Sequence, residues 1–172
     1  MAEFFDTLNE RSSIRGYEKK ELTNEQIDLL IEAGLKAPTA RNLQEVYISA
    51  LKTSDPLAKE IQKELNPNAS NTFYYDAPVL FFLSAETGFK WSFLDSGIAV
   101  ENMHLAAKDM GLGSVILGCI DEVMLGEKKA CFAEKLNIPE GYSFTIALAV
   151  GYPAVEKKQH DIDKEAKSSI ID

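Results

Sequence analysis

Residues 91–110 are apolar on almost every side of the helix that their spacing predicts, and this feature restricts the possible folds more than any other. Hydrophobic side chains such as Phe93, Ile98 and Met103 point in different directions around such a helix. A helix that is apolar nearly all round has to be covered all round. We therefore expect this segment at the centre of a domain or in an interface between subunits.

The rest of the hydrophobic pattern predicts helices interleaved with strands. The short, continuously apolar run 79–83 is typical of a buried central strand. Further strands are predicted at 46–51, 114–117 and 144–150, and helices at 2–9, 23–37, 55–65 and 126–136. This order of elements predicts an α+β fold in which helices pack on a sheet.

Two of these helices begin with specific signals. Thr23 and Gln26 form a capping-box pattern, and Pro38 closes the helix that follows. Asp55 precedes Pro56, and this pair is typical of a helix N-terminus. These signals predict that the two helices begin at Thr23 and Asp55.

The chain has 172 residues, the size of a single domain. We expect one domain over residues 1–153. The tail 154–172 is charged and has too few apolar groups to form a core of its own. We expect it to cross to a partner subunit.

Charge and cysteine content exclude several classes of protein. The net charge of −9 disfavours nucleic acid and anionic membranes as partners. Charged residues within 91–110 also argue against a membrane span. Two cysteines without a CxxC pattern predict neither a disulfide framework nor a metal site. The N-terminal segment lacks the features of a signal peptide, so we expect a cytoplasmic protein.

The arginines are unevenly placed along the chain. All three, Arg11, Arg15 and Arg41, lie in the two polar loops that flank the predicted helix 23–37. Arginine is the preferred residue where a planar group has to bind phosphate, and hydroxyl groups add neutral donors. The set Arg11, Ser12, Ser13 and Arg15 therefore suggests an anion-binding loop. A plain surface loop is the alternative.

The sequence shows no side-chain constellation for catalysis. It has no GxSxG, HExxH or P-loop motif, and Gly111-Leu112-Gly113 follows a helix instead of a strand. Any redox or transfer chemistry would then come from a cofactor that the protein binds and orients. The amides of Asn42 and Gln44 could bond the edge of a planar ring, but from these residues alone ordinary loop polarity is the favoured explanation.

Six segments in register resemble the nitroreductase family of FMN-dependent flavoproteins. They are residues 11–17, 37–44, 75–79, 95–107, 111–114 and 150–153. The resemblance implies a mostly antiparallel sheet flanked by helices, in an interlocked homodimer with two FMN sites at the subunit interface. It covers residues 3–153. Glu45-Val46 departs from the family, in which many members have Pro-Trp at these positions.

The resemblance also implies which residues hold FMN. Arg11, Ser12, Ser13 and Arg15 would bind the phosphate and the ribityl chain, and Lys157, Lys158 and His160 would close the phosphate site. From the other subunit, Pro38, Thr39, Ala40, Asn42 and Gln44 would contact the flavin. Ile116, Leu117 and Gly118 would lie along the isoalloxazine, with a backbone N–H near flavin N5. The resemblance implies no catalytic side chain.

The predicted function is that of an FMN-dependent NAD(P)H oxidoreductase. It would transfer hydride through flavin N5 in two steps, to acceptors such as nitroaromatics or quinones. One alternative is a flavin-binding or specialised-substrate protein of the same fold without general nitroreductase activity. A third reading is an acidic interaction module without a cofactor. The sequence leaves the natural acceptor and the choice between NADH and NADPH open.

Overall fold

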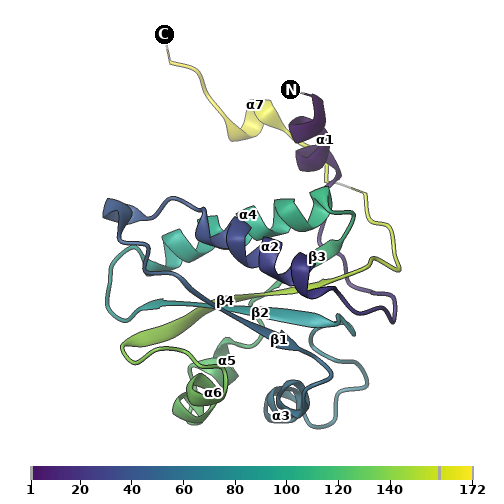
Figure 1. Ribbon diagram of the computed structural model, residues 1–172. Coiled ribbons are helices and arrows are strands. Elements are labelled where there is room, and N and C mark those ends of the chain that lie inside the picture. The colour runs from purple at the N-terminus through teal and green to yellow at the C-terminus, as the bar shows by residue number, and fades with distance from the viewer. Residues whose placement is uncertain (1, 159, 172) are drawn as a thin grey trace.

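A four-stranded sheet divides the molecule into layers, with helices on both faces (Figure 1). The computed structural model describes residues 2–158 and 160–171. Helices α2 and α4 cover one face, and α3, α5 and α6 cover the other. The helices are α1 (Ala2–Glu10), α2 (Asn24–Leu35), α3 (Pro56–Leu65), α4 (Ser92–Asp109), α5 (Asp121–Met124), α6 (Lys129–Lys135) and α7 (Lys164–Lys167), with a 3-10 turn η1 (Ala40–Asn42). The strands are β1 (Tyr47–Lys52), β2 (Val79–Glu86), β3 (Gly113–Leu117) and β4 (Tyr142–Gly151).

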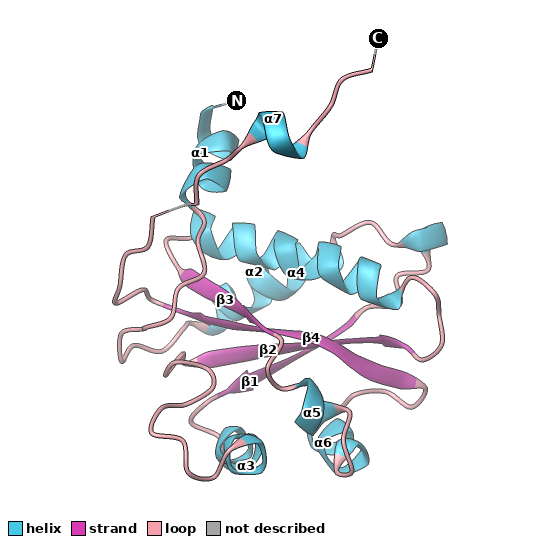
Figure 2. Cartoon of the chain, turned by 180° about the vertical axis from the view of Figure 1, so that it is seen from behind, coloured by secondary structure: helices cyan, strands magenta, loops and turns pink. Residues whose placement is uncertain are grey.

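The strands follow the order β1-β2-β4-β3, and every neighbouring pair is antiparallel. β3 forms one edge of the sheet, as the view from behind shows (Figure 2). The predicted α+β fold with an antiparallel sheet flanked by helices is confirmed, and each predicted strand exists within a few residues of its expected ends.

β2 is the buried central strand that its apolar sequence predicts. Val79, Phe81 and Leu83 are fully buried in the core under α2 and α4. The alternate residues Leu80 and Phe82 belong to the core on the α3 side. Successive side chains of a strand point to opposite faces, so an uninterrupted apolar run is what a strand covered on both faces requires.

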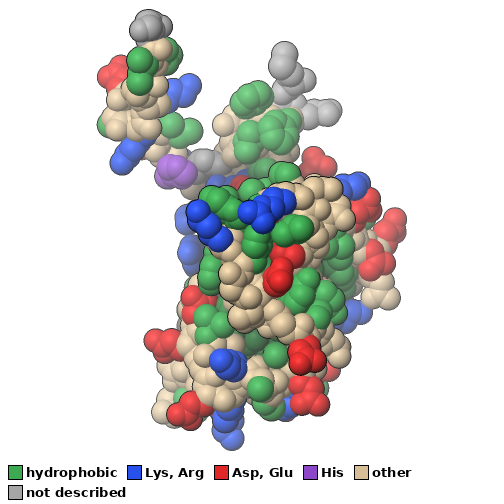
Figure 3. Space-filling view, turned by 90° about the vertical axis from the view of Figure 1, so that its left-hand side faces the viewer, with side chains coloured by type: hydrophobic (Ala, Val, Ile, Leu, Met, Phe, Trp, Pro, Cys, Tyr) green, Lys and Arg blue, Asp and Glu red, His purple; other side chains and the backbone are tan. Residues whose placement is uncertain are grey.

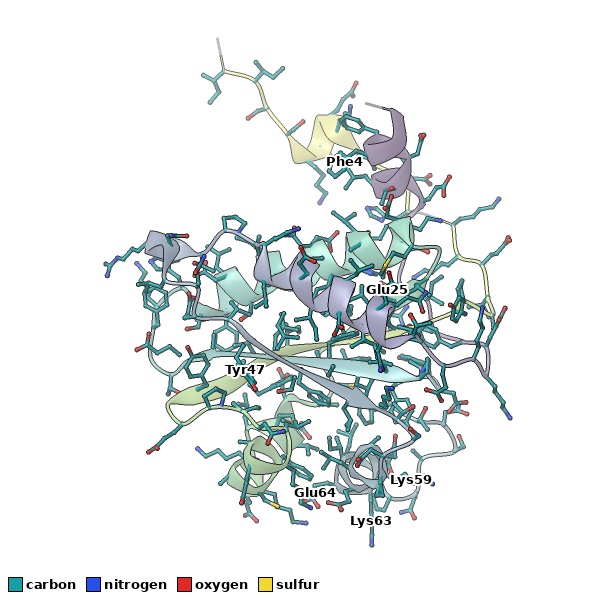
Figure 4. All side chains as sticks on the ribbon, in the orientation of Figure 1. Phe4, Glu25, Tyr47, Lys59, Lys63 and Glu64 are labelled. Atoms are coloured by element: carbon teal, nitrogen blue, oxygen red, sulfur yellow. The ribbon has the colours of Figure 1, made fainter. Side chains whose placement is uncertain are left out.

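The helix starts follow the sequence signals. Thr23 Oγ1 accepts from Gln26 N at 3.1 Å, and Gln26 Oε1 accepts from Thr23 N at 3.0 Å, which completes the capping box. Asp55 caps α3 by accepting from Leu57 N at 2.8 Å. On α3, the exposed side chains of Lys59, Lys63 and Glu64 point away from the sheet (Figure 4).

One predicted helix is wrong in its extent. The segment predicted as a single helix over 126–136 contains only α6, and a separate short helix, α5, precedes it. The chain turns at Gly126, where an added Cβ would lie 2.3 Å from the carbonyl oxygen of Glu122. The close approach of backbone to backbone needs a glycine and separates the two helices.

α4 is central to the fold but is only half covered within one chain. Its inner residues, including Ala99, Met103 and Ala107, are buried against α2 and the sheet. On the outer side, Phe93 is 69% exposed and Leu94 is 55% exposed. The single chain therefore leaves an apolar face of α4 open. No helix in the described part of the chain is long and apolar enough to cross a bilayer.

Both ends of the chain project from the body on the α4 side (Figure 1). Hydrophobic side chains gather on these projecting segments (Figure 3), where Phe4 is 59% exposed and Ile162 is 68% exposed. The tail begins against its own chain, because Ala154 N donates to Gly16 O at 3.0 Å. Beyond Lys158 the described tail residues are exposed and include only the single turn α7.

Candidate anion-binding site

A cavity of ≈ 750 Å³ opens where the end of α1 meets the C-terminal half of α4. The turn from α4 into β3 and the first residues of the tail close its other sides. Its volume is in the range of small-molecule and cofactor sites. The polar residues that line the cavity are Asn9, Glu10, Arg11, Ser12, His104, Lys108, Ser114, Glu156, Lys157 and Lys158. Gly111, Leu112 and Gly113, which connect α4 to β3, also line it.

The loop 11–17 is held along the edge of the sheet by backbone pairing at its middle and by the Tyr17 side chain at its end. Ser13 forms a parallel bridge with Ser114, and Ile14 N donates to Ser114 O at 2.9 Å. Gly113 permits this approach, because an added Cβ would lie 2.9 Å from the Ile14 side chain. The buried Tyr17 hydroxyl donates to Ile14 O at 2.9 Å. A polar loop is thus fixed beside the cavity.

Arg11 reaches the cavity and is held there by α4. Its Nη1 donates to Nε2 of His104 at 2.9 Å, and its Nε lies 3.6 Å from Oε1 of Glu101. The other ring nitrogen of His104, Nδ1, is hydrogen-bonded to Oγ of Ser114. Arginine always carries its proton, so Nε2 has to accept and Nδ1 has to carry the hydrogen. The ring is therefore neutral and donates to Ser114.

Burial explains why this histidine stays neutral. The side chain is 2% exposed, and burial lowers the pKa of His104 to about 4, with the Arg11 guanidinium contributing in the same direction. A charged imidazolium would lose hydration and face a second cation. Burial also raises the pKa of Glu101, while Arg11 opposes that shift.

Positive charge predominates around the cavity although the whole chain is acidic. Arg11, Lys157 and Lys158 line it, and Lys108 lines it in an ion pair with Glu10 at 2.9 Å; Glu156 is the other carboxylate in the lining. Ser12 and Ser114 add hydroxyl groups. Guanidinium, ammonium and hydroxyl donors converging on one cavity suit a phosphate group or another multivalent anion.

The structure brings together only part of the predicted phosphate set. Arg11, Ser12, Lys157 and Lys158 line the same cavity, whereas Ser13, Arg15 and His160 are not among its lining residues. Arg15 is exposed, and its guanidinium lies 5.9 Å from the centre of the Tyr75 ring.

Ile116, Leu117 and Gly118 continue from this cavity along the sheet edge. Ile116 is 38% exposed and Leu117 is buried, as expected for alternating residues of an edge strand. Gly118 follows directly after β3 and is exposed. Ile116 and Gly118 are therefore accessible at the sheet edge, within a few residues of the cavity turn, whereas the side chain of Leu117 points into the core.

The loop 38–44 lies at the opposite end of α4. Ala40 N donates to Oδ2 of Asp95, in the first turn of α4, at 2.9 Å, and Gln44 N donates to Oγ1 of Thr39 at 2.8 Å. Asp95 and Lys108 are separated by about 20 Å along a helix that rises 1.5 Å per residue. The predicted ring-binding residues Pro38, Thr39, Ala40, Asn42 and Gln44 are therefore remote from the cavity of the same chain.

Backbone geometry shapes this second loop. Arg41, Asn42 and Gln44 have φ values of 57°, 56° and 54°, in the left-handed region that few non-glycine residues adopt. Behind them, Glu45 is 4% exposed and no donor reaches either of its carboxylate oxygens. Burial, together with the neighbouring Asp95 carboxyl, raises the pKa of Glu45.

Sequence reasoning missed His104, Lys108 and Ser114 as cavity residues. His104 and Lys108 are four residues apart on α4 and therefore share a helix face. This spacing could have indicated that the two side chains lie in the same site. Which face turns toward the Arg11 loop depends on how α4 packs on the sheet. The position of Ser114 beside that loop depends on strand pairing with Ser13.

Comparison with known proteins gives a consistent result. The model of the Nitroreductase family matches residues 8–152. A protein of Archaeoglobus fulgidus, whose name includes NAD(P)H nitroreductase, is 30% identical over 95% of this chain and 92% of its own length. A Staphylococcus haemolyticus protein named NADPH-dependent oxidoreductase is 31% identical over 87% of this chain, which spans 64% of that protein.

Solved structures agree with the fold. The structure of a nitroreductase with bound FMN from Bacteroides fragilis superposes with a TM-score of 0.88 at 22% identity, covering 98% of each chain. A nitroreductase with bound FMN from Desulfitobacterium hafniense gives a TM-score of 0.89 at 21% identity, covering 100% of each chain.

Proposed function

The chain belongs to the nitroreductase family, and from that premise we propose that it binds FMN and works as an NAD(P)H-dependent oxidoreductase. Relatives named as NADPH-dependent oxidoreductase and FMN reductase, and fold neighbours that hold FMN, support this assignment. A cytoplasmic location is part of the same proposal.

The cavity beside Arg11 is the observation that carries the proposal. FMN ends in a phosphate group, and the cavity offers Arg11, Lys157 and Lys158 as charged donors with Ser12 as a neutral one. Such a donor set fits a phosphate monoester better than it fits a neutral ligand. Ser13, Arg15 and His160 stay in the proposal as contacts to the ribityl chain or the outer phosphate oxygens.

The flavin ring would extend from this cavity along β3. Ile116, Leu117 and Gly118 follow Ser114 on the exposed sheet edge, where a backbone N–H could donate to flavin N5. Pre-positioned backbone donors stabilise developing charge without any special side chain. When bound, FMN would supply hydride transfer at N5 between NAD(P)H and acceptors such as nitroaromatics or quinones.

We infer that the loop 38–44 contacts the flavin ring from a second subunit. Residues 38–44 lie at the far end of α4 from the cavity of their own chain. The open face of α4, with Phe93 and Leu94 exposed, offers the apolar surface for a homodimer. Two-fold pairing would bring the 38–44 loop of one chain toward the cavity of the other. The tail 154–172 would then cross to the partner.

A flavin spectrum and a reduction experiment test the proposal. The purified chain should be yellow, or should bind added FMN, and NADH or NADPH should bleach the flavin rapidly in stopped flow.

Arg11→Ala should weaken FMN binding by about tenfold or more, since a charge-assisted hydrogen bond is lost. Lys59→Gln, an exposed change on α3, is the matched control. Failure of the wild-type chain to bind FMN would refute the proposal, and binding without bleaching would leave only a flavin-binding role.

A further inference from the structure

We propose that His104 is a positioning residue that holds the Arg11 guanidinium in place for the flavin phosphate. The inference rests on the proposed function, because the phosphate is that of FMN. The protein has one histidine in its described core, and it sits between the arginine of the cavity and a serine of the sheet edge.

The geometry allows His104 to restrain the side chain of Arg11. Arg11 follows α1 directly at the rim of the body, and a free arginine side chain samples many rotamers. His104 is 2% exposed and belongs to α4, which packs on the sheet. Its Nε2 accepts from Arg11 Nη1 at 2.9 Å, so a rigid element restrains a flexible cation before any ligand arrives.

Ser114 fixes the ring in turn. By accepting the Nδ1 hydrogen of His104, Ser114 Oγ selects the tautomer that leaves Nε2 free to accept. Through its carbonyl oxygen the same serine accepts from Ile14 N at 2.9 Å. One residue of β3 therefore holds the phosphate loop through its backbone and orients the arginine of that loop through the histidine.

A neutral acceptor suits this position better than a charged one. A carboxylate in direct contact with Nη1 would cancel the positive charge and repel a phosphate, whereas neutral imidazole orients Arg11 and leaves its charge intact. The acidic neighbour, Glu101, lies farther away, at 3.6 Å from Arg11 Nε, and its side chain is 44% exposed. Solvent therefore screens the charge of Glu101, which offsets the positive charge of Arg11 less than a buried carboxylate in direct contact would.

Two amide substitutions separate the two hydrogen bonds of the ring. In His104→Gln the side chain is long enough to present an acceptor to Arg11. In His104→Asn the amide can still donate to Ser114 but is too short to reach Arg11. His104→Leu, which has no polar atom, is the second variant that removes the acceptor. The readout is the ratio of the Kd for riboflavin to the Kd for FMN, measured by equilibrium dialysis of the full-length chain at pH 7.

Riboflavin lacks the phosphate, so this ratio isolates the phosphate site. We expect His104→Asn and His104→Leu to lower the ratio by about tenfold or more, and His104→Gln to keep it within about threefold of wild type. In an Arg11→Ala background, His104→Asn should change the ratio no further, because the effect runs through Arg11.

The outcomes distinguish this inference from the proposed function. If the wild-type chain prefers FMN to riboflavin and His104→Asn and His104→Leu leave that preference unchanged, His104 does not position Arg11. Equal weakening of both ligands would assign the histidine a merely structural role and would also overturn the inference. If the wild-type chain binds FMN no more tightly than riboflavin, the phosphate site of the proposed function fails first.

Discussion

Glu45 and Asp95 form a buried carboxyl pair behind the loop 38–44. Asp95 is 2% exposed and accepts from Ala40 N, whereas Glu45 has no donor to either oxygen. Burial and the neighbouring Asp95 carboxyl both disfavour a negative charge on Glu45. The raised pKa of Glu45 identifies it as the residue that favours the neutral form.

Replacing this carboxyl should stabilise the protein. Because the pKa of Glu45 is higher in the folded chain than in the unfolded chain, its contribution to stability is largest at low pH and is lost as the pH rises above its ordinary value of 4.5. Glu45→Gln should therefore raise the free energy of unfolding at pH 8 by about 1 kcal/mol. The gain should shrink at pH 5.

Denaturant unfolding of the two proteins at both pH values measures this effect. Glu21→Gln, at an exposed glutamate, is the control and should change stability little at either pH. A Glu45→Gln protein that is less stable than wild type at pH 8 would show that the ionised carboxylate is stabilised in the fold.

Among the elements, α2 was the most fully predictable. Its start requires only local hydrogen bonds between Thr23 and Gln26, and both exist. The Gln26 amide also donates to the Tyr152 hydroxyl at 3.1 Å, so the cap is tied to the segment after β4. Gln26 therefore takes part both in the local cap of α2 and in a contact with a distant segment of the chain.

Removing the cap should destabilise the fold by a modest amount. Thr23→Ala leaves the Gln26 backbone N–H without its side-chain acceptor and should lower the free energy of unfolding by about 1 kcal/mol. Thr23→Ser retains the hydroxyl and should remain close to wild type. Denaturant titration of the three proteins provides the comparison, and equal loss in both variants would mean that the threonine methyl group matters more than the cap.

The segment 126–136 shows where element prediction failed. The helix was predicted to begin around Gly126, but α6 begins at Lys129, and the short helix α5 before Gly126 was not predicted. The interruption follows from the contact between Gly126 and the Glu122 carbonyl. Likewise, the site residues Arg11 and Ser12 were predictable from their types and spacing, whereas His104 and Ser114 entered the site through packing.

At the scale of the whole molecule, the open α4 face predicts a dimer. The native mass should be twice the 19.1 kDa of the chain. Phe93→Asp, at a side chain 69% exposed in one chain, would place a charge in the proposed interface, so the dimer should weaken by at least about tenfold. FMN affinity should fall with it, since in the proposed dimer the loop 38–44 of the partner would contact the flavin ring.

A matched change on the opposite face provides the control. Leu125, which follows α5, is 46% exposed, and Leu125→Asp should leave both mass and FMN affinity unchanged. Light scattering coupled to size-exclusion chromatography measures the mass. A wild-type chain that binds FMN as a monomer would contradict the shared site.

The sequence by itself determined the fold class, the central strand, the capped helices and the polar residues around Arg11. These depend on periodicity, capping and residue type, which act over a few neighbouring positions. Tertiary structure decided which residues share the cavity, why His104 is neutral, and why residues 38–44 lie apart from Arg11. These features arise from contacts between segments far apart in the chain, so the register of the strands and the rotation of α4 had to be known first.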